Sequence, residues 1–333
     1  MNKKLLGALI VPMLLTSCNP ANGMNYEPLG VKVLSPIGAP SVSLAAYAGD
    51  TEHVTIAADP SKVVPGAFLK GAGDYDFIIF DGSKGKTFIE KKGAKYKYVR
   101  TVTTGNAYVI DLGNDENGKI EEGDKITTFG DPSIFNAIFK EMYGVTTYNN
   151  VASTGVAAKV LETGLLEGVA QDYVIVSEPF VTRNLAKNPK AKIKCNLADE
   201  FAKYSKEKGY NDGKGYASFP QAALFISDKL ENTTDEALIK ERDNFLKSFD
   251  NFTKDLQHND GKEMLKIIAE NEEKAVYEAK STFGVDKATL DKVLVGNKLA
   301  FNTEDFNING FFNDVNLAGF TPFASTTFSK LYR

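Results

Sequence analysis

The stretch Asp172-Tyr173-Val174-Ile175-Val176-Ser177-Glu178-Pro179-Phe180-Val181-Thr182-Arg183-Asn184 decides the fold class. Residues 173–176 form an apolar run rich in β-branched side chains, which predicts a buried strand. Residues 177–179 end this strand, because proline cannot donate to a sheet ladder and favours extended geometry in the residue before it. A helix is expected from Phe180 onward, with Pro179 at or near its first position. The strand thus runs through a short polar junction into a helix, and open α/β sheets bind ligands at such junctions.

The same strand–loop–helix unit recurs earlier in the chain. Apolar runs predict strands at residues 31–34, 53–58 and 75–80, and this βαβαβ order favours a parallel sheet. Residues 125–129 and 145–152 predict two further strands, each followed by a helix. We therefore expect an α/β protein with two successive series of βα units, and 333 residues are enough for two lobes.

Three local features qualify this pattern. The helix that follows the second strand is expected to be short, because Pro65 and Gly66 break it. The third strand is expected to end in a polar loop, residues 81–84. From residue 233 onward the chain is predicted to be helical, and its final part, rich in Phe, Asn and Thr, is expected to pack on the outside.

The N-terminus has the order of an export signal. Lys3 and Lys4 precede an apolar run, residues 5–15, that is too short to span a membrane as a helix. The following Leu15-Thr16-Ser17-Cys18 resembles the bacterial lipobox, in which the cysteine is lipidated and becomes the first mature residue. We expect residues 1–17 to be a lipoprotein signal peptide and residues 18–28 a polar tether. The alternative is a cleaved secretory peptide with an incidental cysteine.

Charge and residue counts exclude several function classes. The formal net charge is −4 and the lysines are dispersed, which argues against a nucleic-acid partner. The two histidines, His53 and His258, are expected at the surface, at a strand start and near a helix end, so no metal site is expected. No phosphate-loop or dinucleotide motif occurs in the sequence, so no cofactor is expected either. Cys195, the second of two cysteines, lies in an alternating stretch that predicts a strand with Ile193 and Leu197 on the same face. We expect a buried structural thiol there.

Several motifs resemble the solute-binding proteins of ABC importers, in the group that handles nitrate, sulfonates, taurine and thiamine precursors. They are Gly38-Ala39-Pro40 after the first strand, Ser177-Glu178-Pro179-Phe180-Val181-Thr182 with Leu185-Ala186-Lys187-Asn188-Pro189 behind it, and Phe219-Pro220-Gln221-Ala222-Ala223-Leu224. Their order covers most of the chain behind the lipobox.

The resemblance implies a bilobed fold of the type II periplasmic-binding-protein class, with two doubly wound βα lobes joined by two crossing segments. Lobe one would hold residues 29–108 and 219–333, and lobe two residues 109–218. The implied function is the extracytoplasmic, lipid-anchored binding component of an ABC importer. It would act as a monomer, capture a small organic solute, anionic or heterocyclic, and deliver it to a permease and its ATPase.

The strand ends and crossing segments supply the expected ligand contacts, because helix N-termini there offer free amides and a dipole that favours anions. They are Gly38, Ala39, Pro40, Ser41, Asp81, Gly82, Asn106, Ser133, Ser153, Thr154, Gly155, Glu178, Phe180, Phe219 and Gln221. Arg100 and Arg183 are either forks for an acid group or surface ion pairs. Tyr108, Phe180, Tyr216 and Phe219 either stack on a ligand or belong to the core.

Two other function classes stay open. An enzyme on the same fold, of the pyrimidine-forming or porphobilinogen type, would need catalytic groups, and no catalytic residue is assigned. Glu178 has no partner acid or nucleophile in the pattern, so we interpret it as a ligand contact or a capping group. A surface adhesin or structural lipoprotein is the third class, and it predicts a cleft filled by side chains.

Overall fold

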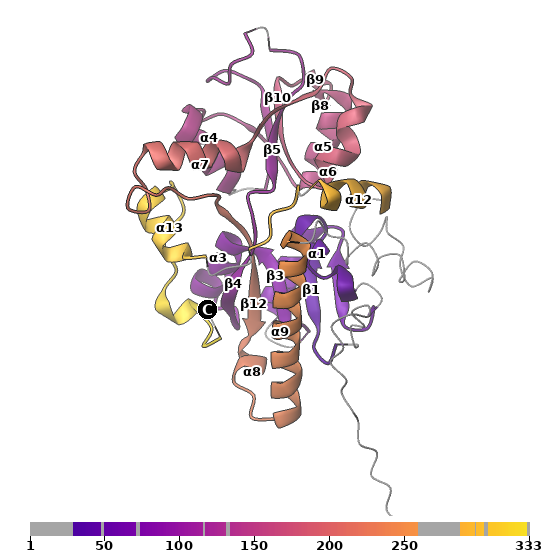
Figure 1. Cartoon of the computed structure of the whole chain (residues 1–333), viewed down its shortest axis with the longest axis vertical. Coiled ribbons are helices and arrows are strands. Elements are labelled where there is room, and N and C mark those ends of the chain that lie inside the picture. Colours follow the sequence, from indigo (N-terminus) through magenta and orange to yellow (C-terminus); the bar gives the residue numbers. More distant parts are fainter. Residues whose placement is uncertain are drawn as a thin grey trace, which may run out of the picture.

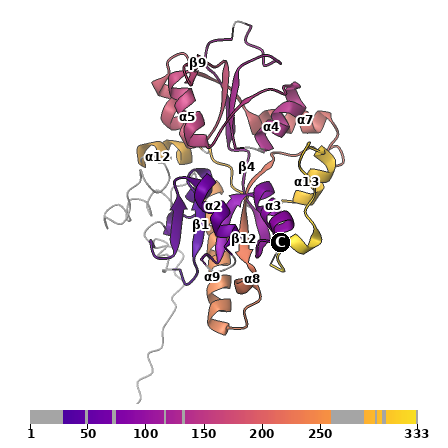
Figure 2. The same cartoon turned by 180° about the vertical axis from the view of Figure 1, so that it is seen from behind.

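The computed structural model describes residues 29–47, 50–70, 74–115, 117–130, 134–258, 287–296, 298–302 and 306–331. It contains two five-stranded sheets, each flanked by helices, one above the other in Figures 1 and 2. The expected α/β architecture with two lobes is confirmed. None of the helices in these described ranges has both the length and the apolarity that crossing a membrane requires.

The first sheet has the order β2-β1-β3-β12-β4. β1 pairs in parallel with both β2 and β3, as the βαβαβ pattern predicts. β12 returns late in the chain and pairs antiparallel with β3 and β4. The strands are β1 (Val33–Pro36), β2 (Val54–Ala57), β3 (Phe77–Asp81), β4 (Tyr96–Thr104) and β12 (Pro220–Ser227). The helices of this part are α1 (Ala39–Val42), η1 (Ala45–Tyr47), α2 (Pro60–Leu69), α3 (Gly82–Lys92), α8 (Asp228–Glu231) and α9 (Glu236–His258).

The second sheet has the order β11-β5-β10-β6-β7, with β10 at its centre. β10, the strand of the opening stretch, is buried at all five of its residues, as its apolar sequence predicts. The strands are β5 (Ala107–Asp111), β6 (Ile126–Phe129), β7 (Asn149–Val151), β10 (Tyr173–Ser177) and β11 (Lys192–Asn196), beside a small hairpin of β8 (Leu165–Leu166) and β9 (Val169–Ala170). The helices are α4 (Ile134–Tyr143), α5 (Thr154–Thr163), α6 (Phe180–Asn184), η2 (Leu185–Lys187) and α7 (Leu197–Glu207).

The chain passes between the sheets at Gly105 and Asn106, and again between α7 and β12. Gly105 has φ +48°, and a Cβ there would lie 2.2 Å from Ser218 Oγ on the returning segment and 2.5 Å from Ala198 Cβ. Only glycine combines this conformation with so close an approach. The two crossing segments are therefore packed against each other at this point.

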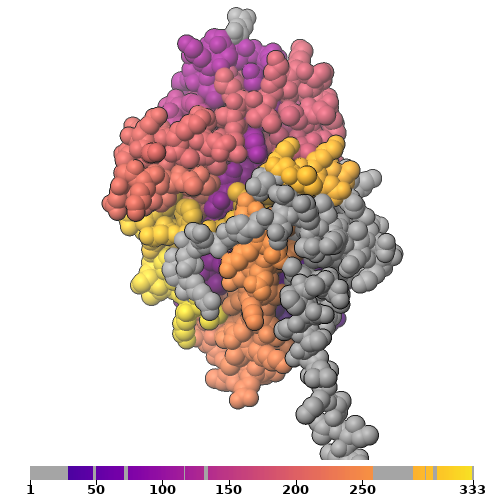
Figure 3. Space-filling view, viewed as in Figure 1, coloured from indigo at the N-terminus to yellow at the C-terminus, as the bar shows by residue number. Residues whose placement is uncertain are grey.

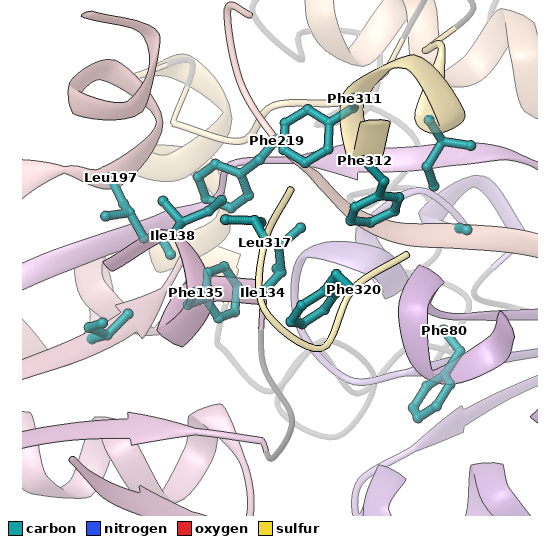
Figure 4. Packing of buried hydrophobic residues seen from close by; sticks show 14 of the residues in the cluster. Phe80, Ile134, Phe135, Ile138, Leu197, Phe219, Phe311, Phe312, Leu317 and Phe320 are labelled. Atoms are coloured by element: carbon teal, nitrogen blue, oxygen red, sulfur yellow. The ribbon is translucent and has the colours of Figure 1, made fainter. Parts of the chain in front are cut away.

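The C-terminal part is core, so the expectation that it packs on the outside is wrong. It comprises α12 (Lys287–Val295), α13 (Ile308–Val315) and η3 (Ser325–Thr327). Phe311, Phe312 and Phe320 are buried in one hydrophobic cluster that also holds Phe219 and Phe135 (Figure 4). This cluster takes residues from both sheets, so the tail packs where the lobes meet.

α2 runs through Pro65, so the predicted break in this helix is wrong. Proline removes the hydrogen bond to the carbonyl four residues earlier, which belongs to Ser61. Ser61 is exposed, so water can satisfy that carbonyl. The burial of Val64, Ala67 and Phe68 then holds the helix together. Residues 81–84 differ from prediction too, because α3 begins at Gly82 directly after β3.

The Cys195 strand is irregular. Its register against β5 shifts between Ile193 and Cys195, which leaves Ile193 45% exposed, so the predicted common face is wrong. Cys195 is half-buried and free, and burial raises the pKa of its thiol. A raised pKa makes the thiol less reactive, in line with the predicted structural role.

Candidate functional site

A cavity of about 200 Å³ lies between the two sheets, at the ends of strands from both. It is reached by the C-terminal ends of β1 and β3 on one side and of β6, β7 and β10 on the other. This is the position where open α/β sheets hold ligands. The predicted contacts that line it are Gly38, Ala39, Pro40, Asp81, Ser153, Thr154, Gly155, Glu178 and Gln221.

Five predicted contacts lie near the cavity but do not line it. Phe219 packs against Phe135 and Phe201 in the core, with ring centroids 5.9 and 5.8 Å apart. Phe180 is buried beneath Gly38, Gly82 packs against Ala223, and Ser41 hydrogen-bonds with Gly38. The fifth, Asn106, is held at the crossing. Ser133 lies outside the described residues.

The other predicted candidates, two arginines and two tyrosines, lie outside the cavity lining. Arg100 Nη1 pairs with Asp250 Oδ1 at 2.9 Å, and neither Arg100 nor Arg183 lines the cavity. Tyr216 packs on Phe311 and donates to Asp314 Oδ2 at 2.7 Å. Tyr108 is half-buried away from the cavity.

The cavity has aromatic walls that the sequence analysis missed, Phe80, Phe129 and Phe135. Phe80 and Phe129 lie at the C-terminal ends of β3 and β6, and Phe135 lies in the first turn of α4. Their place at strand ends is the signal that identifies them, because this position faces the boundary between the sheets. Of the two polar contacts not predicted, Ser177 also ends a strand, β10, whereas Lys84 lies in the first turn of α3.

On the side of the second sheet, the N-terminus of α5 presents hydrogen-bond donors to the cavity. Ser153 caps this helix, and its Oγ accepts from the Val156 amide at 3.4 Å. Within the described residues, the Thr154 and Gly155 amides have no acceptor, as expected of a first helical turn. Ser177 Oγ is buried and has no hydrogen-bond partner among the described residues. The two amides and the Ser177 hydroxyl are therefore available to donate to an acceptor on a ligand.

On the opposite side, the junction of β3 and α3 contributes one acidic and one basic side chain. Asp81 caps α3 by accepting from the Lys84 amide at 2.8 Å, and burial raises the pKa of its carboxyl. The Lys84 ammonium reaches across to the second sheet, where it would lie 3.3 Å from a Cβ added to Gly130. Gly130 has φ +70°, so a side chain there would be strained and would crowd the ammonium.

Glu178 is 1% exposed and caps α6 rather than pairing with a catalytic partner. Its two oxygens accept from the Thr182 amide at 3.0 Å and from Thr182 Oγ1 at 2.9 Å. Thr182 Oγ1 in turn accepts from Lys298 Nζ at 3.1 Å. Burial is the main cause of the raised pKa of this carboxyl. The contacts match the predicted capping role.

Asn106, in the first crossing segment, forms hydrogen bonds with three other parts of the chain. Its Oδ1 accepts from the Ala300 amide at 2.5 Å and its Nδ2 donates to Ala300 O at 3.3 Å. Its amide bonds Gln221 Oε1 at 3.2 Å, and its carbonyl accepts from the Glu178 amide at 2.9 Å. Residues 298–302 therefore lie beside both crossing segments, next to two residues that line the cavity.

The described residues contain no group of three or more His, Cys, Asp and Glu side chains placed to hold a metal ion. His53 instead lies 2.8 Å from Asp50 Oδ1. Asp81 and Glu178 are each bonded to a helix terminus rather than facing a common point.

Comparisons with known proteins give similarity in structure alone. No family model and no curated protein sequence matches the chain. The ligand-binding component of an ABC-type import system from Staphylococcus aureus, solved with zinc bound, has TM-score 0.61 and 11% identity; the match covers 90% of this chain and 96% of that one. The aliphatic sulphonate-binding protein SsuA of Escherichia coli, a periplasmic protein, has TM-score 0.54 and 10% identity, with 87% and 86% covered.

The same fold also carries an enzyme. The desulfurization enzyme DszB has TM-score 0.51 and 8% identity, and the match covers 90% of this chain and 96% of that one. At these identities the comparisons establish the fold and leave the function to the site. The chain has the fold shared by ABC-import binding proteins such as SsuA.

Proposed function

We propose that the protein is the extracytoplasmic solute-binding component of an ABC importer, and that its solute is a small organic anion. The observation that carries this proposal is the cavity between the sheets, where unpartnered donors face aromatic walls. A binding protein needs such a cavity, largely preformed, with few polar groups that orient the ligand. An open cavity also counts against the adhesin, for which a filled cleft is expected.

The donors favour an acidic group over a neutral or cationic one. The Thr154 and Gly155 amides lie at the positive end of the α5 dipole, beside the Ser177 hydroxyl. Lys84 adds a positive charge on the other wall. The aromatic rings would cover the apolar part of the solute, as buried rings do in most small-molecule sites.

The wider organisation belongs to the same proposal. Lobe one would hold residues 29–108 and 219–333 and lobe two residues 109–218, with the protein acting as a monomer on a permease and its ATPase. Cys18 would carry the lipid anchor behind the signal peptide, residues 1–17, and residues 18–28 would tether the lobes to the membrane. A Cys18→Ala protein that is still processed and retained in the membrane would exclude that anchor.

Ser177→Ala tests the binding site, with Ser218→Ala as its control. Both hydroxyls are buried and unpartnered among the described residues, but only Ser177 lines the cavity. A thermal-shift panel of organic sulfonates, carboxylates and heterocycles would first identify a ligand, and calorimetry would then give its affinity. Losing a hydrogen bond to a charged group costs about 1.5–3 kcal/mol, so Ser177→Ala should weaken binding at least about tenfold. Ser218→Ala should bind as the wild type does.

Two results would contradict the proposed function, and a third would contradict the proposed position of the ligand. Stabilisation by metal ions or nitrate, with no response to any organic anion, would exclude the organic solute. Conversion of a bound solute to product during the panel, detected by mass spectrometry, would place the chain among the enzymes of this fold. Equal binding by wild type and Ser177→Ala would move the ligand away from the α5 terminus.

A further inference from the structure

A second cavity, of about 520 Å³, adjoins the first along α3. Ser61, Phe80, Lys84, Gly130 and Ala152 line both cavities, so the two are direct neighbours with Lys84 at the boundary. The second cavity also lies between the sheets, because α3 lines one wall and β7 the other. A ligand too long for the first cavity would enter the second beside Lys84.

The charge of the second cavity is of one sign. Its charged lining residues are Lys84 and Lys92, and no lining residue is acidic. Lys84, Phe88 and Lys92 follow one another at intervals of four along α3, which places them on one stripe of the helix. Lys92 Nζ lies 4.8 Å from the centre of the Phe88 ring, which keeps its ammonium near the cavity wall. Among the described residues, Lys92 and Lys84 form no salt bridge, and the charge nearest to Lys84 is the buried Asp81 carboxyl of the first cavity.

The spacing gives the length of the part of the ligand that would lie in the second cavity. Lys84 and Lys92 are eight residues apart, which is about 12 Å along a helix that rises about 1.5 Å per residue. Between them the wall is the Phe88 ring, with Phe80 behind the junction. An apolar chain or ring system fits this wall, and an acidic group fits each end of the space.

We propose that the solute is an elongated organic diacid. One acidic group binds the α5 N-terminus and Ser177 in the first cavity, the apolar body passes Phe80 and Lys84, and the second acidic group meets Lys92. The inference rests on the proposed function, because it extends the same site. It narrows the solute from any small anion to one with acidic groups at both ends.

The probes that test it are alkane-α,ω-disulfonates and the alkane monosulfonates of equal chain length. The series extends beyond about ten carbons, because the path from Ser177 past Lys84 to Lys92 is longer than the roughly 12 Å between the two lysines. Calorimetry on the full-length protein should show the longer disulfonates binding about two- to fivefold more tightly than the monosulfonates of equal length. This is the gain in affinity expected from one partly exposed ion pair. Rising salt should shrink that difference, because exposed charges are screened.

Lys92→Ala and Lys91→Ala form a matched pair on the same helix turn. The two lysines are neighbours in the sequence and both are exposed, but only Lys92 lines the cavity. Lys92→Ala should remove the advantage of the disulfonates and leave monosulfonate affinity unchanged. Lys91→Ala should change neither, which controls for the loss of one positive charge.

Three results would overturn the diacid assignment. They are equal affinity for both probe series in the wild type, an equal loss for both series in Lys92→Ala, and no binding of either series. In the first two cases a monosulfonate still binds, so the proposed function stands while the inference fails. Failure of every organic anion, including those of the thermal-shift panel, would remove the proposed function as well.

Discussion

Asp81 and Glu178 line the cavity from opposite sides, and each caps a helix. Burial raises the pKa of both carboxyls, so each is more easily neutral than an exposed acid. A neutral or hydrogen-bonded carboxyl repels an anionic solute less than a free carboxylate does. The two acids are therefore compatible with a site built from donors.

The pH dependence of stability gives a test of the Glu178 environment. Since the pKa is raised in the folded protein, the contribution of Glu178 to stability is fully present below its unfolded pKa and is lost as pH rises through the folded value. Glu178→Gln keeps an acceptor for Thr182 but cannot ionise. The melting temperature of this variant, relative to wild type, should therefore rise between about pH 4 and about pH 8, on either side of the usual range for a glutamate.

Glu207→Gln, at an exposed position in α7, controls for the loss of a negative charge. Its melting temperature relative to wild type should not follow the Glu178→Gln curve. A constant difference between Glu178→Gln and wild type across the pH range would mean that Glu178 ionises without cost, against its burial.

At this scale the sequence predicted the backbone junctions better than the side chains that line them. Gly38, Ser153 and Glu178 were predicted because a strand end is visible in the sequence, and strand ends meet at one edge of a sheet. Phe135 and Lys84 were not predicted, because whether a side chain one turn into a helix faces the cavity depends on how two sheets pack. Asn106 was predicted as a ligand contact but bonds Ala300 instead. The sequence does not reveal this, because the two residues are 194 positions apart.

Elements were predictable where one periodicity dominated. β10 and α5 are where the pattern places them, because a short apolar run and a capping serine each suffice locally. The length of α2 was not predictable, because the energetic cost of Pro65 inside a helix depends on whether the Ser61 carbonyl is exposed to water. The packing of the C-terminal part was not predictable either. Its phenylalanines follow no helix or strand periodicity, and they contact residues of both sheets that are distant in the sequence.

Phe311→Ala should show how much the C-terminal part stabilises. Phe311 is fully buried and contacts Phe201 of α7, Tyr216 before β12, and Phe312, with ring centroids 5.8, 5.1 and 5.4 Å apart. Truncating a buried phenylalanine costs about 3–5 kcal/mol. The urea midpoint should fall accordingly, with both sheets unfolding in one transition because they share this cluster.

Val295→Ala is the control for that measurement, because Val295 is 59% exposed in the same C-terminal part. It should change the free energy of unfolding by less than about 0.5 kcal/mol. A midpoint for Phe311→Ala equal to that of Val295→Ala, or two separated transitions in the wild type, would mean that the tail does not join the lobes.

For the whole molecule, the question is how far two lobes so connected can move. Besides the two crossing segments, α12 packs against α6 across the boundary, and Figure 3 shows it lying against the half of the molecule that holds the second sheet. α13 meets the second lobe through Asp314, which accepts from the Asn211 amide at 2.9 Å. These contacts lie on both sides of the crossing, so they limit lobe rotation more than two bare segments do.

We predict that ligand still closes the lobes, by a small amount, and that Asn106 sets its limit. Asn106→Ala removes both side-chain bonds to Ala300 and leaves that amide unpaired at the crossing, which should cost about 1–3 kcal/mol in the free energy of unfolding. It loosens residues 298–302 at the crossing, although the Thr104 amide still donates to Ala300 O and the Asn302 amide to Val102 O. The backbone bonds of residue 106 to Gln221 and Glu178 also persist. Small-angle scattering should therefore show a smaller radius of gyration with saturating ligand in both proteins, with the larger change in Asn106→Ala. An unchanged radius in both would exclude closure, and equal changes would mean that the Ala300 contact does not restrain it.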